Sequence, residues 1–154
     1  MKIHKYLIGV LFLFLSVYAR ASVEVRSVHV TTNDGIVNNS IRHIFQDSKG
    51  FIWFGTLNGL SRYDGNSFVN FRPSLKDTLS LADHRIRQIS EDKNGFLWIS
   101  TFAELYSCYD LKKDCFVDFT GCGEYNQRYS DKRITSNGDC WLWHKGNGCR
   151  RVRY

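Results

Sequence analysis

The sequence predicts an all-β protein: an incomplete β-propeller of about two and a half four-stranded blades that follows an N-terminal signal peptide. Three observations predict it. A segment recurs after 45 residues, each copy divides into four short strand-like runs, and the N-terminus has the pattern of an export signal. We therefore divide the chain into a signal peptide at 1–21 and propeller blades at 22–154.

The repeat is the main evidence for the blades. Residues 41–56 read IRHIFQDSKGFIWFGT and residues 86–101 read IRQISEDKNGFLWIST, so eight of the sixteen positions are identical. Unrelated segments would share about one. A third, weaker copy begins near 133–134. Four pairs of residues define the repeat: Asp47 and Asp92, Gly50 and Gly95, Trp53 and Trp98, Thr56 and Thr101.

Each copy also divides into four strands. In the first copy we expect strands at 41–46, 51–56, 60–63 and 67–71. Glycine-containing turns separate them, and Asn58-Gly59 favours a hairpin turn of primed geometry. Four strands within about 45 residues, with glycine at the turns, are typical of one propeller blade.

The apolar pattern indicates strands that are covered on both faces. Residues 51–54 are apolar without alternation, whereas a strand with one solvent-exposed face would alternate. Blades pack between neighbouring blades, which explains this pattern. We therefore interpret Trp53 and Trp98 as inter-blade core and not as a platform for a ligand.

Two arginines recur as well, Arg42 and Arg87. Their repetition allows a functional interpretation. We favour a structural one, in which the aliphatic stem is buried and the guanidinium group caps a turn carboxylate such as Asp47 or Asp92. This interpretation predicts an arginine–aspartate contact inside each blade.

The N-terminus predicts export. Lys2 and Lys5 precede an apolar run at 6–18, and Ala19 and Ala21 supply the small residues of a signal cleavage site. A run of this length is too short to cross a bilayer core of about 30 Å. An uncleaved membrane anchor is the alternative. We expect cleavage and delivery of the remaining chain to the periplasm.

The charge of the chain does not indicate a nucleic-acid partner. The formal net charge is +6, but residues 1–21 contain three basic residues and no acidic one, so their removal leaves +3. The remaining charges are of mixed sign along the chain, which is typical of a solvated surface. We expect no nucleic acid to bind this segment.

The five cysteines lie in the second half of the chain, where export would allow disulfides to persist. Cys108 and Cys115 flank an expected hairpin tip, and Cys140 and Cys149 bracket a second one. These four residues are therefore candidates for disulfides, although the sequence leaves their pairing open. The spacing around Cys140 matches no common zinc pattern, and we expect no metal site.

The stretch from Asn39 to Gly65 resembles the two-component regulator propeller repeat. That repeat runs Asp-x-x-Gly-x-[Leu/Ile]-Trp-[Ile/Phe]-Gly-Thr-x-x-Gly-Leu-x-x-[Tyr/Phe]. The first copy matches it closely, and the second matches until Ala103, where the expected Asn-Gly-Leu is absent. In the third copy Trp143 and His144 replace the Gly-Thr pair.

The resemblance implies a function in signalling. Such repeats form the N-terminal periplasmic sensor region of Bacteroidetes-type hybrid two-component histidine kinases, which respond to oligosaccharides and control transcription through a phosphorelay. It implies an intact receptor that is a membrane-anchored homodimer in the inner membrane. For this chain it implies a glycan-sensing segment, and the loops on one propeller face would hold the ligand.

The residues themselves indicate no catalysis and no cofactor. No nucleophile elbow, kinase motif or partnered histidine is present, so we assign no catalytic residue and leave the ligand-binding residues open. Closing a propeller takes about four to eight blades, so we expect a fragment that packs against further blades of the same chain. The alternatives are a secreted propeller that binds or degrades polysaccharide, and a small exported protein stapled by disulfides.

Overall fold

A computed structural model describes residues 27–77, 79–118, 131–134, 140–144 and 148–152. The predicted signal peptide, with Ala19 and Ala21, lies outside these residues. The prediction of an all-β fold is confirmed. The described residues form two antiparallel sheets of four strands and one of three strands, with a single turn of 3-10 helix, η1 (Thr32–Asp34), ahead of them.

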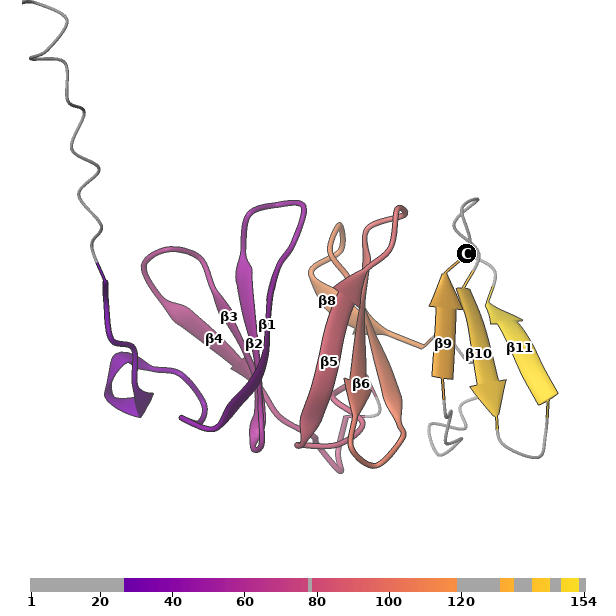
Figure 1. Cartoon of the computed structure of the whole chain (residues 1–154), viewed down its shortest axis with the longest axis horizontal. Coiled ribbons are helices and arrows are strands. Elements are labelled where there is room, and N and C mark those ends of the chain that lie inside the picture. The colour runs from indigo at the N-terminus through magenta and orange to yellow at the C-terminus, as the bar shows by residue number, and fades with distance from the viewer. Residues whose placement is uncertain (1–26, 78, 119–130, 135–139, 145–147, 153–154) are drawn as a thin grey trace, which may run out of the picture.

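Each sheet is one blade, in which consecutive strands are neighbours (Figure 1). Blade 1 consists of β1 (Ile41–Gln46), β2 (Ile52–Thr56), β3 (Gly59–Tyr63) and β4 (Phe68–Phe71). Blade 2 consists of β5 (Ile86–Glu91), β6 (Phe96–Thr101), β7 (Tyr106–Asp110) and β8 (Cys115–Val117). Blade 3 consists of β9 (Asp131–Ile134), β10 (Cys140–His144) and β11 (Gly148–Val152).

The turn between β2 and β3 differs from the predicted primed geometry. A primed turn of type I′ requires positive φ at both central residues, and neither Leu57 nor Asn58 has it. The hydroxyl of Thr56 shapes this turn instead. It accepts a hydrogen bond from the Asn58 amide at 3.0 Å and donates one to the Gly59 carbonyl at 2.8 Å, and the positive φ falls on Gly59 at 126°.

The blades are arranged as a fan. β1 and β2 of blade 1 lie against β5 of blade 2. The outer strands meet through their side chains, since the rings of Phe71 on β4 and Phe116 on β8 lie 5.6 Å apart. In Figure 1 the three blades stand side by side, with β1 and β5 in front of the other strands of their blades. We call β1 and β5 the inner strands, because the blades approach each other most closely there.

The core lies between the blades, as the unalternating apolar runs predict. Trp53 is fully buried; its ring stacks on Phe71 at 5.7 Å and meets Tyr109 of blade 2 edge-on at 5.3 Å. Trp98 is also fully buried, in a cluster that includes Cys108 and Leu142 of blade 3. Both tryptophans are thus core side chains.

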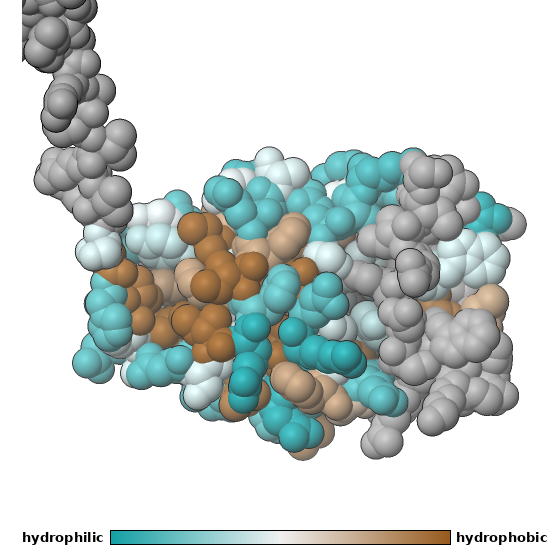
Figure 2. All heavy atoms as spheres, viewed as in Figure 1, coloured by the Kyte–Doolittle hydropathy of each residue, from teal (hydrophilic) through white to brown (hydrophobic). Residues whose placement is uncertain are grey.

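Blade 1 leaves one face open. Ile86 and Ile89 of blade 2 are 0% and 1% exposed because they pack against blade 1. Their repeat counterparts, Ile41 and Ile44, are 37% and 59% exposed. In Figure 2 an apolar area occupies the surface of blade 1. We call this the open face, and it corresponds to the side of blade 2 that packs on blade 1.

Candidate functional site

The repeat-defining residues form one hydrogen-bonded turn in each blade. The buried Asp47 carboxylate accepts hydrogen bonds from the amides of Lys49 and Phe51, at 2.9 and 3.0 Å, and from Trp53 Nε1 at 2.7 Å. Gly50 completes this turn with a φ of 90°, a left-handed conformation that favours glycine.

Blade 2 repeats this turn. Asp92 accepts from the amides of Asn94 and Phe96, at 2.9 and 3.1 Å, and from Trp98 Nε1 at 2.9 Å, and Gly95 has a φ of 86°. An aspartate, a glycine and a tryptophan recur together because one carboxylate ties the turn to the indole of the next strand.

This geometry overturns the role predicted for the repeated arginines. Arg42 and Arg87 are exposed and contact neither Asp47 nor Asp92. Each aspartate already accepts hydrogen bonds from a tryptophan indole and from backbone amides, so these groups satisfy it without a guanidinium group. The prediction that the arginines cap turn carboxylates is therefore wrong.

A polar cluster locks blade 1 to blade 2. The guanidinium group of Arg62, on β3, lies 4.8 Å from the Phe51 ring centroid and forms a salt bridge with Asp114, in the turn between β7 and β8. The Tyr109 hydroxyl donates to Asp114 at 2.9 Å. The bond from Arg62 holds the pKa of Asp114 below its usual range, and burial raises the pKa of Tyr109.

We expect the contribution of this lock to depend on pH. The lowered pKa of Asp114 means that the stabilisation is present at neutral pH and is lost as pH falls through the pKa of the folded state. Asp114 is largely exposed, so Asp114→Asn should cost no more than about 1 kcal/mol near pH 7. The measurement is urea unfolding of both forms at pH 7 and at about pH 3. A difference that does not shrink at low pH would contradict this prediction.

One end of the fan carries the loops that sequence predicts for ligand binding. We define the loop face by four segments: 38–40 and 83–85, which precede the inner strands, and 57–58 and 102–104, which follow β2 and β6. In Figure 1 these segments lie along the lower edge of the blades. All four connect strands whose positions are fixed by the blade cores.

The backbone of the loop face repeats between blades. The Leu57 amide donates to the Ser40 carbonyl at 3.1 Å, and the Phe102 amide donates to the Arg85 carbonyl at 3.0 Å. The side chains on this repeated frame differ: leucine and serine in blade 1, phenylalanine and arginine in blade 2. A rigid frame with variable side chains is what a recognition surface requires.

Charged and aromatic groups meet on the blade 2 part of the loop face. Asp83 Oδ1 lies 2.9 Å from His84 Nδ1, and Asp83 Oδ2 lies 3.8 Å from Arg85 Nε without a hydrogen bond. Phe102, beside Arg85, is 49% exposed. An exposed ring next to hydrogen-bonding groups suits a small polar ligand that also has an apolar face.

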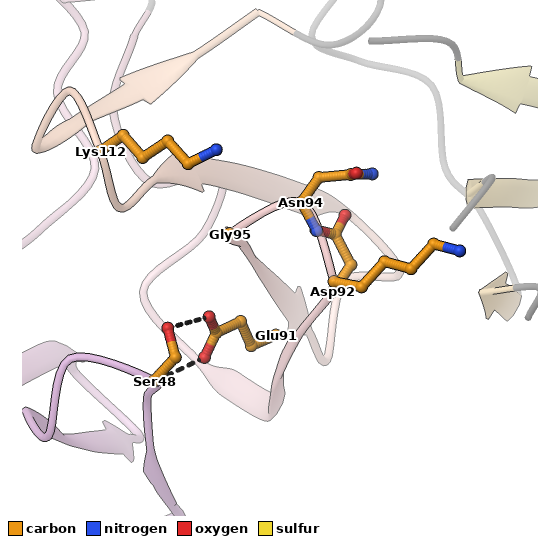
Figure 3. A pocket seen from close by; sticks show the side chains of 7 residues that line it. Ser48, Glu91, Asp92, Asn94, Gly95 and Lys112 are labelled. Atoms are coloured by element: carbon orange, nitrogen blue, oxygen red, sulfur yellow. Dashed lines mark hydrogen bonds between the residues drawn. The ribbon is translucent and has the colours of Figure 1, made fainter. Parts of the chain in front are cut away.

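A pocket of about 510 Å³ lies at the opposite end of the fan (Figure 3). Ser48, from the blade 1 turn, binds the Glu91 carboxylate of blade 2 through its amide at 2.7 Å and its hydroxyl at 2.5 Å. These two hydrogen bonds join the two blades at the pocket wall. Its lining is formed by Ser48, Glu91, Asp92, Lys93, Asn94, Gly95 and Lys112.

Comparison with known proteins identifies the repeat. A family model of the two component regulator propeller matches residues 35–58 and 80–103, which contain β1, β2, β5 and β6. These two segments are two-component regulator propeller repeats. The resemblance predicted from the Asp-x-x-Gly-x-[Leu/Ile]-Trp pattern is confirmed.

Solved structures of extracellular domains from signalling systems cover most of the chain. Two structures of the extracellular domain of BT4673 from B. thetaiotaomicron, described once as a one component and once as a hybrid two component system, are 29% and 30% identical, with TM-scores of 0.59 and 0.57. They cover 80% and 83% of this chain, which spans 18% and 19% of their length. The extracellular domain of BT3049 has the same fold, with a TM-score of 0.62 over 82% of this chain and 20% of its own.

One curated relative is a histidine kinase. Histidine kinase P4 of Formosa agariphila is 36% identical over 52 residues, which are 34% of this chain and 4% of that protein. The regulator propeller repeats of this chain thus match short parts of much longer proteins. In the described residues no helix is long and apolar enough to cross a membrane, and no three acidic, histidine or cysteine side chains are grouped as metal ligands.

In the described part of the chain Cys108 is a buried thiol, and Cys115 and Cys149 are exposed thiols that face no other cysteine. The side chain of Cys140 lies outside this part, so the pairing of the cysteines stays a prediction. Strand register accounts for the free thiols, because Cys108 lies opposite Val117 and Cys115 lies opposite Asp110. In blade 3 the partner of Cys149 in β10 is Trp143. Two cysteines that flank a hairpin tip in the sequence are therefore not opposite each other on neighbouring strands.

A pair of serines was missed by sequence reasoning. Ser61 Oγ accepts from the Val37 amide at 2.9 Å, and Ser107 Oγ accepts from the Ala82 amide at 2.8 Å. Each bond joins the third strand of a blade to the segment that leads into its first strand. The signal was available, since both serines stand two residues before a repeated Tyr-Asp pair in the regulator propeller repeats.

Proposed function

We propose that this chain is the ligand-sensing propeller segment of a two-component receptor and that its ligand is an oligosaccharide. The observation that carries the proposal is the pairing of regulator propeller repeats with similarity to extracellular domains of signalling systems. The intact receptor would be a histidine kinase, a homodimer anchored in the inner membrane. This segment would lie in the periplasm and would have no catalytic role.

The loop face supports recognition of a sugar. A sugar ring presents C–H groups that pack on aromatic rings and hydroxyl groups that bind charged side chains. Phe102, Arg85 and Asp83 offer both kinds of contact on one rigid frame. The disulfide-stapled alternative is less favoured, because Cys108 and Cys115 do not lie opposite each other in the register of β7 and β8.

Truncation of Phe102 tests the proposal. We expect Phe102→Ala to weaken binding of an oligosaccharide ligand by about tenfold, the loss of one aromatic contact worth roughly 1–1.5 kcal/mol. The measurement is isothermal titration calorimetry against a panel of neutral and acidic oligosaccharides. Val69→Ala is the matched control, because Val69 is 43% exposed but lies on the outer strand β4. Equal losses for both variants, or no binding by the unmodified chain, would contradict the proposal.

We further propose that the open face receives another blade of the same polypeptide. The supporting observation is the difference in exposure between Ile44 and Ile89. Ile89 is buried by the neighbouring blade, blade 1, and Ile44 occupies the same position without a neighbouring blade against it. Sequencing the gene on both sides of this segment tests the receptor and the further blades together. A gene that encodes no additional repeat and no kinase would refute both.

A further inference from the structure

The inner strands of blades 1 and 2 share a β-bulge at the same position. The register between β1 and β2 shifts at Arg42, and the register between β5 and β6 shifts at Arg87. Each arginine is the extra residue of its bulge and has no cross-strand partner. Bulges re-aim the side chain they carry, and they are common next to binding sites.

Neither arginine is neutralised by the described part of the chain. Both side chains are exposed, and among the described residues they form no hydrogen bond and no ion pair. The acidic groups at the far ends of the inner strands have other partners. Glu91 binds Ser48, and Asp47 and Asp92 hold the tryptophan indoles.

The two arginines belong to strands in direct contact. β1 lies against β5, and the Ile89 amide donates to His43 Nδ1 at 3.3 Å. From its first residue, β1 contains no acidic side chain, and β5 contains none before Glu91. In Figure 2 strongly hydrophilic side chains cover the surface between blades 1 and 2, beside the apolar area of blade 1. The inner edge of the fan therefore carries two unpaired positive charges.

We propose that Arg42 and Arg87 together bind an oxyanion, a carboxylate or sulfate group, at the inner edge of the fan. A guanidinium group stays charged at any physiological pH and offers a planar pair of donors that matches two oxygens of such a group. Because the bulge is repeated, two adjacent blades each supply one guanidinium group. The oxyanion belongs either to an acidic sugar, in which case the site rests on the proposed function and narrows its ligand class, or to a free inorganic ion.

The experiment is a titration of the full chain with sodium sulfate, with an oligogalacturonate and with a neutral oligosaccharide, at constant ionic strength set with sodium chloride. Calorimetry gives affinity, and the Nε–Hε resonances of arginine in ¹⁵N spectra identify the groups that respond. We expect the signals of Arg42 and Arg87 to shift on addition of oxyanion. Each of Arg42→Gln and Arg87→Gln should weaken binding by about tenfold or more, as the loss of a charged hydrogen bond predicts.

Two further variants complete the test. Arg42→Lys keeps the charge without the fork and should recover only part of the affinity. Arg72→Gln is the matched control, since Arg72 is an exposed arginine outside the bulges, and it should bind like the unmodified chain. Equal losses for Arg72→Gln and Arg42→Gln, or no arginine-dependent oxyanion binding, would overturn the inference.

The ligands separate the two sources and the two proposals. Preference for oligogalacturonate over sulfate would identify an acidic sugar, and equal affinity would identify a site for inorganic anions. Binding of the neutral oligosaccharide alone, unaffected by the bulge variants, would leave the proposed function standing and overturn the arginine site. Arginine-dependent sulfate binding without any sugar binding would support the arginine site and overturn the proposed function.

Discussion

Replacement of Trp53 by alanine is expected to lower the free energy of unfolding by about 3–5 kcal/mol, the cost of truncating a large aromatic side chain in a core. Trp53 is fully buried between blades 1 and 2, where its ring contacts Phe71 and Tyr109. The substitution also removes the Nε1 donor that satisfies the buried Asp47 carboxylate. A small domain has a total stability of only about 5–15 kcal/mol, so most of the folded population is at risk.

Urea unfolding followed by tyrosine and tryptophan fluorescence measures this loss. Trp53→Phe is the informative companion, because it keeps an aromatic ring and removes the N–H group. The deficit that remains includes the loss of the hydrogen bond to Asp47 Oδ2. Trp98→Ala should cause a loss of similar size, since Trp98 is also fully buried and also donates to the aspartate of its turn. A Trp53→Ala chain as stable as the unmodified one would contradict the assignment of Trp53 to the core.

Substitution of Gly59 by alanine is expected to cost about 2–5 kcal/mol, the sum of two effects. Gly59 has a φ of 126°, where a side chain costs about 1–2 kcal/mol. In addition, a Cβ atom would lie 2.7 Å from the Phe71 carbonyl oxygen and 3.2 Å from Val37 Cγ2. Backbone atoms cannot move aside cheaply, and overpacking of this kind costs about 1–3 kcal/mol more.

Gly65→Ala is the control that separates the two effects. Gly65 also has positive φ, at 101°, but its added Cβ would meet nothing within 4 Å. Thermal and urea unfolding of both variants should therefore give a smaller loss for Gly65→Ala, of about 1–2 kcal/mol from backbone strain alone. If both glycines gave the same loss, the close approach of β4 to the turn at Gly59 would be unimportant for stability.

The sequence was sufficient to predict the blades because the two copies of the repeat can be compared with each other. Two copies that share Asp, Gly, Trp and Thr at the same spacing divide into strands in the same way, and β1 has the predicted bounds of 41–46. The inter-blade core followed from the unalternating run at Phe51, because only a strand covered on both faces needs such a run.

Interactions within one repeat were harder to predict than the strands. The role of Arg42 was misjudged because the sequence gives no indication that the Asp47 carboxylate is occupied by an indole. Cys108 and Cys115 do not lie opposite each other because register, and not distance from a hairpin tip, decides which side chains face each other.

Contacts that are not repeated could not be predicted. The salt bridge of Arg62 with Asp114 joins residues that are 52 positions apart in the sequence, and Cys108 stands at the position of Arg62 in the second copy. The loop face was expected in general terms, but its frame of Ser40 and Arg85 carbonyls depends on backbone geometry that has no signature in residue type.

The open face has a consequence for the order of folding. Blade 2 follows blade 1 directly along the chain, so the surface around Trp53 is covered by a segment about one repeat away, a contact of short sequence separation that forms early. Among the described residues Ile44 stays 59% exposed. If a more distant segment covers it, as proposed, the entropic cost of closing that contact grows with the length of the intervening chain. The open face would then be the last apolar surface of blade 1 to leave water, and thus the part of the blade most prone to aggregation during synthesis.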